Sequence, residues 1–259
     1  MKKIQVKWLP LLAAILLLLT ACTQAPDTQT TAETTAFEID APATSSPAPQ
    51  EVLFTVTEHQ LPPPEQAFDA DFEAFYKAFT KAVQNNDMAF INSILDDEVM
   101  SSFGGDLGKG FFHEHWAQKE QALWDELEKI IALGGVYYQA GEYTPELGKC
   151  YAAPYVYTNF DGEKFDVYEH FIIAGADVPV YNEASAASST IDTLNYNIMK
   201  FHNSPAFREK GPDDFVRIET QAGTTGYIQK KHLRSPIGYR LCIEQKGGEW
   251  KLLWLIAGD

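Results

Sequence analysis

The sequence His113-Glu114-His115 is the first place where residue type suggests chemistry, because imidazoles and carboxylates are the ligands of many metal sites. In a helix, residues i and i+2 lie about 200° apart, so the two imidazoles could not bind one ion. In a strand they could, but no third ligand is identifiable. We therefore expect two polar positions beside apolar neighbours, and we assign no metal and no cofactor.

A glycine-rich stretch, residues 104–110, has the glycines and the lysine of a phosphate cradle. It lacks the four-residue spacing and the Ser or Thr that holds Mg²⁺ in a P-loop. Asp106 would also repel a phosphate. We therefore expect a tight turn that leads into a helix.

Cys150 and Cys242 are the two cysteines outside the N-terminal segment. A disulfide between them is permitted outside the cytoplasm, and two separate buried thiols are the alternative. A Cys–His hydrolase would need a histidine beside one of the thiols. Three histidines follow Cys150, but no motif marks either cysteine as a nucleophile. We assign no catalytic residue; the sequence favours a non-enzymatic role and leaves an enzymatic one open.

Lys230-Lys231-His232-Leu233-Arg234 is the one basic cluster in an acidic sequence. Lys230, Lys231 and Arg234 could bind an anionic polymer or a peptide carboxylate. A solvated loop after a strand is the alternative. The sequence is compatible with either role.

The charge of the whole chain restricts its partners. The 259 residues include 20 Lys and Arg against 36 Asp and Glu, which gives a formal charge of −16 at pH 7. Nucleic acid binding needs a basic face, so we expect no nucleic acid partner. With 45% apolar residues, the chain is long enough for one or two packed domains.

The first 21 residues predict export. Three lysines precede an apolar run from Trp8 to Leu19, a pattern typical of a signal peptide. As a helix this run would rise only about 18 Å, which is less than the bilayer core of about 30 Å.

Leu19-Thr20-Ala21-Cys22 resembles the lipobox of bacterial lipoproteins. The resemblance implies that the chain is cut before Cys22 and that its thiol is acylated. The protein would then be exported and anchored by lipid to a bacterial membrane, on the extracytoplasmic side. More than one acyl chain makes such attachment lasting.

The segment after Cys22 predicts a tether. Residues 23–50 contain seven Thr, six Ala, four Pro and two Ser, and cannot form a core. Residues 52–56 could make a short strand, and Pro62-Pro63-Pro64 closes the linker. We expect residues 22–64 to be a largely disordered linker and the folded part to start at about Glu65.

Helical patterns dominate the first part of the folded region. Apolar side chains at spacings of three and four predict an amphipathic helix between residues 68 and 83. Asp87 is the expected N-cap of a second helix that runs through Leu95. A third helix is expected from about Gln118 to Leu133, before the glycines at 134 and 135.

Strand patterns follow. Residues 151–157, 166–173, 215–219 and 225–229 read as strands. The last 21 residues predict a hairpin, because apolar residues alternate on both sides of the turn at residues 246–248.

Part of this region resembles the bacterial Src-homology-3-like (SH3-like) domain. The likeness covers about 60 residues and rests on short motifs, namely Val178-Pro179-Val180-Tyr181, Phe215-Val216-Arg217-Ile218, Gly226-Tyr227-Ile228 and Leu233. Tyr181 replaces the family's usual Arg, and residues 203–214 look like an insertion. Such barrels bind extended peptides or wall fragments on exposed aromatic side chains. The resemblance therefore implies that Tyr181, Tyr196 and Tyr227 contact the ligand here.

The expected helices, the Ser102-Phe103-Gly104-Gly105 stretch and the closing residues 234–259 resemble a group of bacterial lipoproteins with no assigned activity. The α+β part is similar to the nuclear transport factor 2-like cone. We therefore predict an α+β fold: an N-terminal helical segment packed on an antiparallel sheet, residues 65–170 completed by 235–259. A small all-β SH3-like barrel, 171–234, is inserted before the C-terminal hairpin.

These observations favour a membrane-anchored, acidic envelope lipoprotein that acts as a non-catalytic binding module. Its expected ligands are peptide, peptidoglycan or another envelope protein. The alternative is a small-ligand-binding or hydrolytic pocket in the α+β domain.

Overall fold

The described part of the protein is residues 51–105, 107–211 and 213–258 of a computed structural model. Among these residues, helices and two β-sheets share the chain, so the predicted α+β class is confirmed. The predicted signal peptide, Cys22 and most of the predicted linker lie outside the described residues. Within them, no helix combines the length and apolar character that a membrane span requires.

The helices form where local signals predict them. Asp69 caps α1 (Ala70–Gln84) by accepting from the backbone N–H of Phe72, and Asp87 caps α2 (Met88–Ile94) by accepting from that of Phe90. α4 (Glu120–Leu133) ends at Gly134, whose φ of 71° favours glycine. α3 spans Lys109–Trp116.

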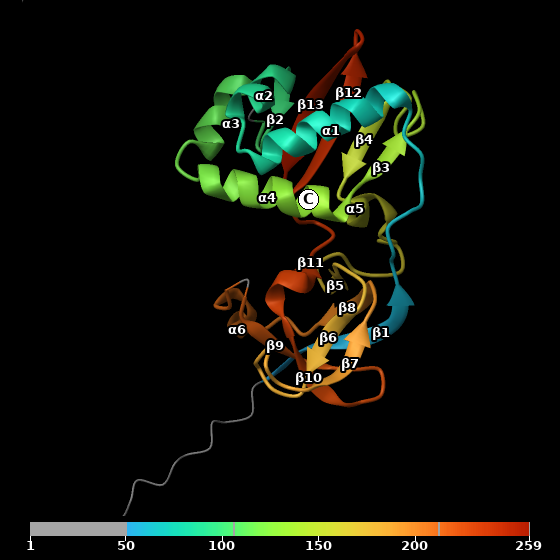
Figure 1. Ribbon diagram of the computed structural model, residues 1–259, viewed down its shortest axis with the longest axis vertical. Helices are drawn as coiled ribbons and strands as arrows, with labels where there is room; N and C mark the ends of the chain where they lie inside the picture. Colours follow the sequence, from blue (N-terminus) through green and yellow to red (C-terminus); the bar gives the residue numbers. More distant parts are fainter. Residues whose placement is uncertain (1–50, 106, 212, 259) are drawn as a thin grey trace, which may run out of the picture. The chain divides into compact units, whose positions relative to one another are not determined.

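Helices α1 and α4 pack against a five-stranded sheet (Figure 1). The strand order of this sheet is β2-β13-β12-β4-β3. Its strands are β2 (Leu95–Met100), β13 (Glu249–Ile256), β12 (Arg240–Lys246), β4 (Cys150–Ala153) and β3 (Val136–Tyr138). β12 and β13 are the predicted C-terminal hairpin, with Lys246 opposite Glu249. β2 is parallel to β13, so the sheet is mixed and not wholly antiparallel as predicted.

The space between these helices and the sheet is a packed aromatic core. Phe72, Tyr151 and Trp250 are all buried there, and the Phe72 ring contacts the other two. Rings of this size bury much apolar surface and fill the layer.

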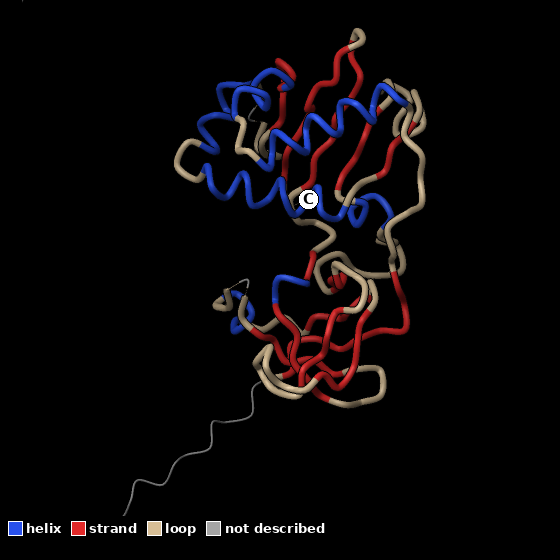
Figure 2. Tube along the Cα trace, in the orientation of Figure 1, coloured by secondary structure: helices blue, strands red, loops and turns tan. Residues whose placement is uncertain are grey.

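An eight-stranded sheet has the order β11-β5-β8-β1-β9-β10-β6-β7. Its strands are β1 (Val52–Gln60), β5 (His170–Ile173), β6 (Val178–Tyr181), β7 (Thr190–Leu194), β8 (Asn197–Phe201), β9 (Phe215–Glu219), β10 (Thr225–Gln229) and β11 (Leu233–Arg234). Strands are drawn in red in Figure 2. β9 and β10 match their predicted bounds. The end strands β11 and β7 pair with β5 and β6 respectively, and the described strands form no closed barrel.

Strand β1 is the main difference from the predicted organisation. It lies within the segment 22–64 that the composition assigns to the linker, yet it pairs antiparallel with β8 and parallel with β9. Leu53, Phe54 and Val56 are buried in the core of this sheet. Residues 171–234 therefore lack a central strand of the sheet to which they belong.

Two other strands are shorter than predicted. β4 ends at Ala153, after which a cis Ala153–Pro154 bond leads into α5 (Tyr155–Asn159) in place of a continued strand. β5 begins only at His170. A smaller core cluster, with Tyr155, Val156, Ile172 and Ile198, joins α5 to the eight-stranded sheet.

Candidate functional site

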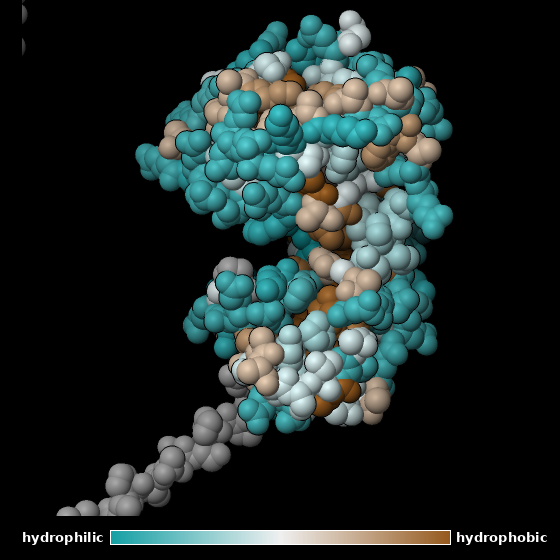
Figure 3. Space-filling model, viewed as in Figure 1, coloured by the Kyte–Doolittle hydropathy of each residue, from teal (hydrophilic) through white to brown (hydrophobic). Residues whose placement is uncertain are grey.

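A cleft of about 620 Å³ lies where α4 faces the segment from α6 (Pro205–Arg208) to β11. We call it the basic cleft. The surface is hollowed in this region of the molecule (Figure 3). Its lining combines an apolar floor with charged side chains, namely Leu133, Phe171, Phe207 and Leu233 with Lys129, Lys210, Lys230, Lys231, Arg234 and Glu126.

Helix α4 supplies one wall of the basic cleft. Glu126, Lys129 and Leu133 are spaced three and four residues apart, so they share one face of the helix. Leu123, Leu127 and Ile130 belong to the buried core beneath. The amphipathic pattern that folds the helix thus also presents the charged wall.

The 3₁₀ turn Lys230–His232 and β11 supply the opposite wall. The Lys230 Nζ donates to the carbonyl oxygens of Phe207, at 3.0 Å, and Lys210, at 2.5 Å. It also lies 4.5 Å from the centre of the Phe207 ring. Burial lowers the pKa of Lys230, and the nearby Asp214 opposes that shift. Lys230 therefore fixes the segment after α6 against the sheet.

Arg234 is the most buried cation of the basic cleft, with 8% of its surface exposed. Its guanidinium pairs with the Glu126 carboxylate at 3.3 Å and donates to the Tyr239 carbonyl oxygen. Glu126 also pairs with Lys129, at 2.6 Å. The Glu126 carboxylate thus pairs with both Arg234 and Lys129. Burial lowers the pKa of Arg234, which Glu126 opposes, and a guanidinium keeps its charge in proteins.

The basic cleft reverses the charge of the chain. Its lining has five basic side chains and one acidic one, a net +4, whereas the chain as a whole carries −16. His232 beside it adds little charge at neutral pH, because burial and then the Lys231 charge lower its pKa below 6.5. Such a local excess of one sign attracts an oppositely charged ligand.

Tyr181 and Tyr227 lie elsewhere, on the outer face of the eight-stranded sheet. They are directly opposite each other on β6 and β10. The Phe215 ring meets Tyr181 edge to face at 5.6 Å, and Arg217 is opposite Tyr227. We call these four residues the aromatic face. All four are only partly exposed.

Tyr196 belongs to neither region. It occupies the turn before β8 with a φ of 52°. Its backbone N–H donates to the Gly175 carbonyl, and its carbonyl accepts from the N–H of Leu61. The six residues predicted to bind ligand therefore separate into the basic cleft (Lys230, Lys231, Arg234), the aromatic face (Tyr181, Tyr227) and Tyr196 alone.

Cys150 and Cys242 are fully buried on the neighbouring strands β4 and β12. Both are free thiols. Their mutual hydrogen bond, and then burial, raise the pKa of Cys242, which makes it a poor nucleophile. The same hydrogen bond lowers the pKa of Cys150, and burial opposes that shift. Their oxidation to a disulfide stays a prediction.

The His113-Glu114-His115 sequence lies in α3, the case in which the two imidazoles diverge. The His115 imidazole is 3.0 Å from the Lys119 Nζ, a neighbour that disfavours a metal. Over residues 51–105, 107–211 and 213–258, no cluster of three or more His, Cys, Asp or Glu could hold a metal ion. In the glycine-rich stretch, the Gly108 amide donates to the Val99 carbonyl and Lys109 pairs with Asp97. These contacts join Gly108 and the start of α3 to β2.

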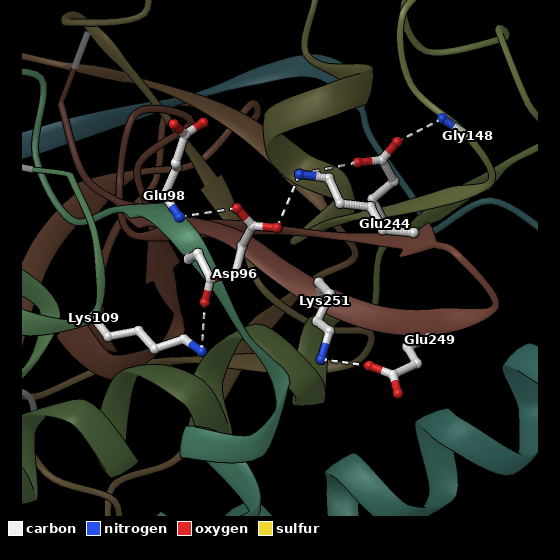
Figure 4. Close-up of polar contacts among 9 residues, drawn as sticks. Asp96, Glu98, Lys109, Gly148, Glu244, Glu249 and Lys251 are labelled. Carbon is white, nitrogen blue, oxygen red and sulfur yellow. Dashed lines mark hydrogen bonds and ion pairs between the residues drawn. The ribbon is translucent and has the colours of Figure 1, made fainter.

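A second group of charges lies at the sheet that contains the hairpin (Figure 4). Lys246 bridges Asp96, at 2.9 Å, and the buried Glu244, at 3.8 Å. Glu244 also accepts from the Gly148 backbone N–H at 2.7 Å. We call Asp96, Glu244 and Lys246 the paired network. Burial opposes ionisation of Asp96, but its hydrogen bonds from Lys246 and Glu98 lower its pKa.

Sequence reasoning missed part of the basic cleft. Glu126 and Lys129 were visible only as the polar side of an expected helix, and Lys210 as part of an expected insertion.

Compared with family models, curated proteins and solved structures, the chain gives no match.

Proposed function

We propose that this protein is an exported lipoprotein of a bacterial envelope, acylated at Cys22, that binds an anionic envelope ligand without catalysing a reaction. Its ligand would be a wall polymer or a peptide of the wall or of another envelope protein. The lipobox at Leu19–Cys22 and the Thr, Ala and Pro-rich segment after it support the anchor and the tether.

The observation that carries the binding role is the net +4 lining of the basic cleft in a chain of −16. A chain of this charge would avoid polyanions unless one surface were organised to attract them. Lys231 is exposed and Lys210 partly so, which leaves both within reach of a ligand.

The SH3-like resemblance supports a binding module in a second way. β6, β9 and β10 carry the motifs of that resemblance and present Tyr181 and Tyr227 side by side. We propose the aromatic face as an accessory contact for an extended ligand. An SH3-like relationship remains part of this proposal, with β1 as an added central strand.

The alternative, a hydrolytic or ligand pocket in the α+β part, has less support. Phe72, Tyr151 and Trp250 fill the layer where such a cavity would lie. In the described ranges, neither buried thiol is hydrogen-bonded to a histidine.

The test is co-sedimentation with purified sacculi at about 0.15 M salt. The protein is the chain of residues 22–259 with Cys22→Ser; a fragment from Glu65 would lack β1. We expect pelleting that Lys210→Glu/Lys231→Glu weakens at least about tenfold, equivalent to about 1.4 kcal/mol. Lys77→Glu/Lys81→Glu on α1 makes the same change in net charge and should pellet like the parent.

Equal pelleting of the two charge-reversed variants would show that the basic cleft is not the binding surface. No pelleting of the parent would remove wall polymers and wall peptides as ligands. Tyr227→Ala measures the accessory role of the aromatic face in the same assay.

A further inference from the structure

The charge of the basic cleft exceeds what a single carboxylate can neutralise. Glu126 is already shared by Lys129 and Arg234. In the described part of the chain, no other carboxylate lines the cleft beside Lys210, Lys230 and Lys231, and Asp214, outside the lining, acts on Lys230. Cations held together in a partly enclosed site repel one another, so the most favourable ligand brings more than one negative charge.

A phosphate monoester meets this requirement better than a carboxylate. It carries a charge of roughly −1.5 to −2 at neutral pH and three strong acceptor oxygens. Lys230 uses two of its three ammonium donors on backbone carbonyls and keeps one. Lysine ammonium groups of the neighbouring Lys231 and Lys210 can supply the remaining donors to a tetrahedral group.

The floor of the cleft is apolar and favours a ligand that has an apolar group as well as a phosphate. Leu133, Phe171, Phe207 and Leu233 all line it. At about 620 Å³, the cleft matches sites for molecules of drug size, roughly 300–1,000 Å³. A ligand that covers this floor gains about 25 cal/mol for each Å² of apolar surface removed from water.

We propose that the basic cleft binds a phosphate monoester that carries an apolar group, with the phosphate on Lys210, Lys230 and Lys231 and the apolar group on the floor. This inference rests on the proposed function and names the chemistry of its ligand. The same chemistry occurs in lipid phosphates of a membrane and in soluble apolar phosphates.

The test compares probes that differ in one feature, by calorimetry on the Cys22→Ser chain below the micelle concentration of each probe. The probes are decyl phosphate, decanoate and inorganic phosphate. We expect decyl phosphate to bind at least about tenfold more tightly than decanoate and about a hundredfold more tightly than inorganic phosphate. Lys210→Glu/Lys231→Glu should weaken decyl phosphate at least about tenfold, whereas Lys77→Glu/Lys81→Glu should not.

Two results would overturn the inference directly. Equal affinity for decanoate would show that the second negative charge is not recognised. Equal affinity for inorganic phosphate would show that the apolar floor is not used.

The sacculus assay distinguishes failure of this inference from failure of the proposed function. If pelleting depends on Lys210 and Lys231 but decyl phosphate does not bind, the ligand is another anion and the proposed function stands. If decyl phosphate binds but no wall material does, the inference stands without a wall ligand. Vesicles of neutral phospholipid with and without phosphatidic acid then distinguish the sources: phosphatidic acid-dependent binding indicates a membrane lipid, and its absence a soluble phosphate.

Discussion

The basic cleft and the paired network both gather charged side chains, but they use them differently. In the paired network, Lys246 pairs with the carboxylates of Asp96 and Glu244, and the backbone N–H groups of Glu98 and Gly148 each donate to one of them (Figure 4). Among the described residues, the buried Glu244 Oε2 accepts no hydrogen bond and has only the Lys246 charge beside it, at 3.8 Å. In the basic cleft, five cations face one carboxylate. The difference teaches that a cluster in which each charge has an opposite charge beside it serves the fold, whereas a cluster with an excess of one sign is suited to a ligand.

Changing Glu126 tests the one carboxylate of the basic cleft and should have the largest effect on stability. Glu126→Gln leaves the buried Arg234 charge without its partner, which should lower the free energy of unfolding by about 2 kcal/mol. The same change raises the positive charge, so decyl phosphate should bind more tightly. Urea unfolding and calorimetry measure the two effects. Unchanged stability together with weaker binding would contradict this account of Glu126.

Changing Lys246 tests the paired network. Lys246→Met leaves the buried Glu244 without a cation, but the lysine is 46% exposed, so water screens much of the loss. We expect a decrease in unfolding free energy of about 1 kcal/mol, measured by urea unfolding. Binding of sacculi and of decyl phosphate should not change. A loss of binding equal to that of Lys210→Glu/Lys231→Glu would remove the distinction between the two regions.

The aromatic face gives a smaller effect. Tyr227→Ala removes the cross-strand pair with Tyr181, a contact of roughly 0.2–1 kcal/mol. Thermal unfolding should shift only slightly, and sacculus pelleting should weaken less than in the cleft variant. A greater loss of pelleting from Tyr227→Ala would move the main binding surface to this face.

Acid should affect the paired network through Asp96. The folded-state pKa of Asp96 is lowered, so its stabilisation is complete well above its ordinary pKa of 3.8 and is lost as the pH falls through and below that value. Asp96→Asn should therefore show a smaller decrease in stability than the parent between pH 5 and pH 3, by urea unfolding at each pH. A parallel decrease in both proteins would show that Asp96 does not contribute.

The elements that local signals define could be predicted from the sequence. The caps Asp69 and Asp87 and the stop at Gly134 act through neighbouring backbone groups, so at most a few residues decide them. The turn at residues 246–248 fixes the hairpin in the same way. Asp87, Gly134 and this hairpin were all predicted.

Long-range pairing was harder to predict. The pattern of residues 52–60 shows a strand, but its partners, β8 and β9, lie about 140 and 160 residues further along the chain. Glu126 and Arg234 are likewise 108 residues apart. Each side of the basic cleft is an ordinary helix face or loop alone, and only tertiary contacts show that they form one site.

The position of β1 also has a mechanical consequence. The chain before Glu51 leads directly into a strand that is hydrogen-bonded on both sides. Removing β1 from the sheet would break two ladders of hydrogen bonds, whereas removing an edge strand would break one. If the N-terminus is anchored as proposed, the tether would join the folded part at a strand that is held on both sides.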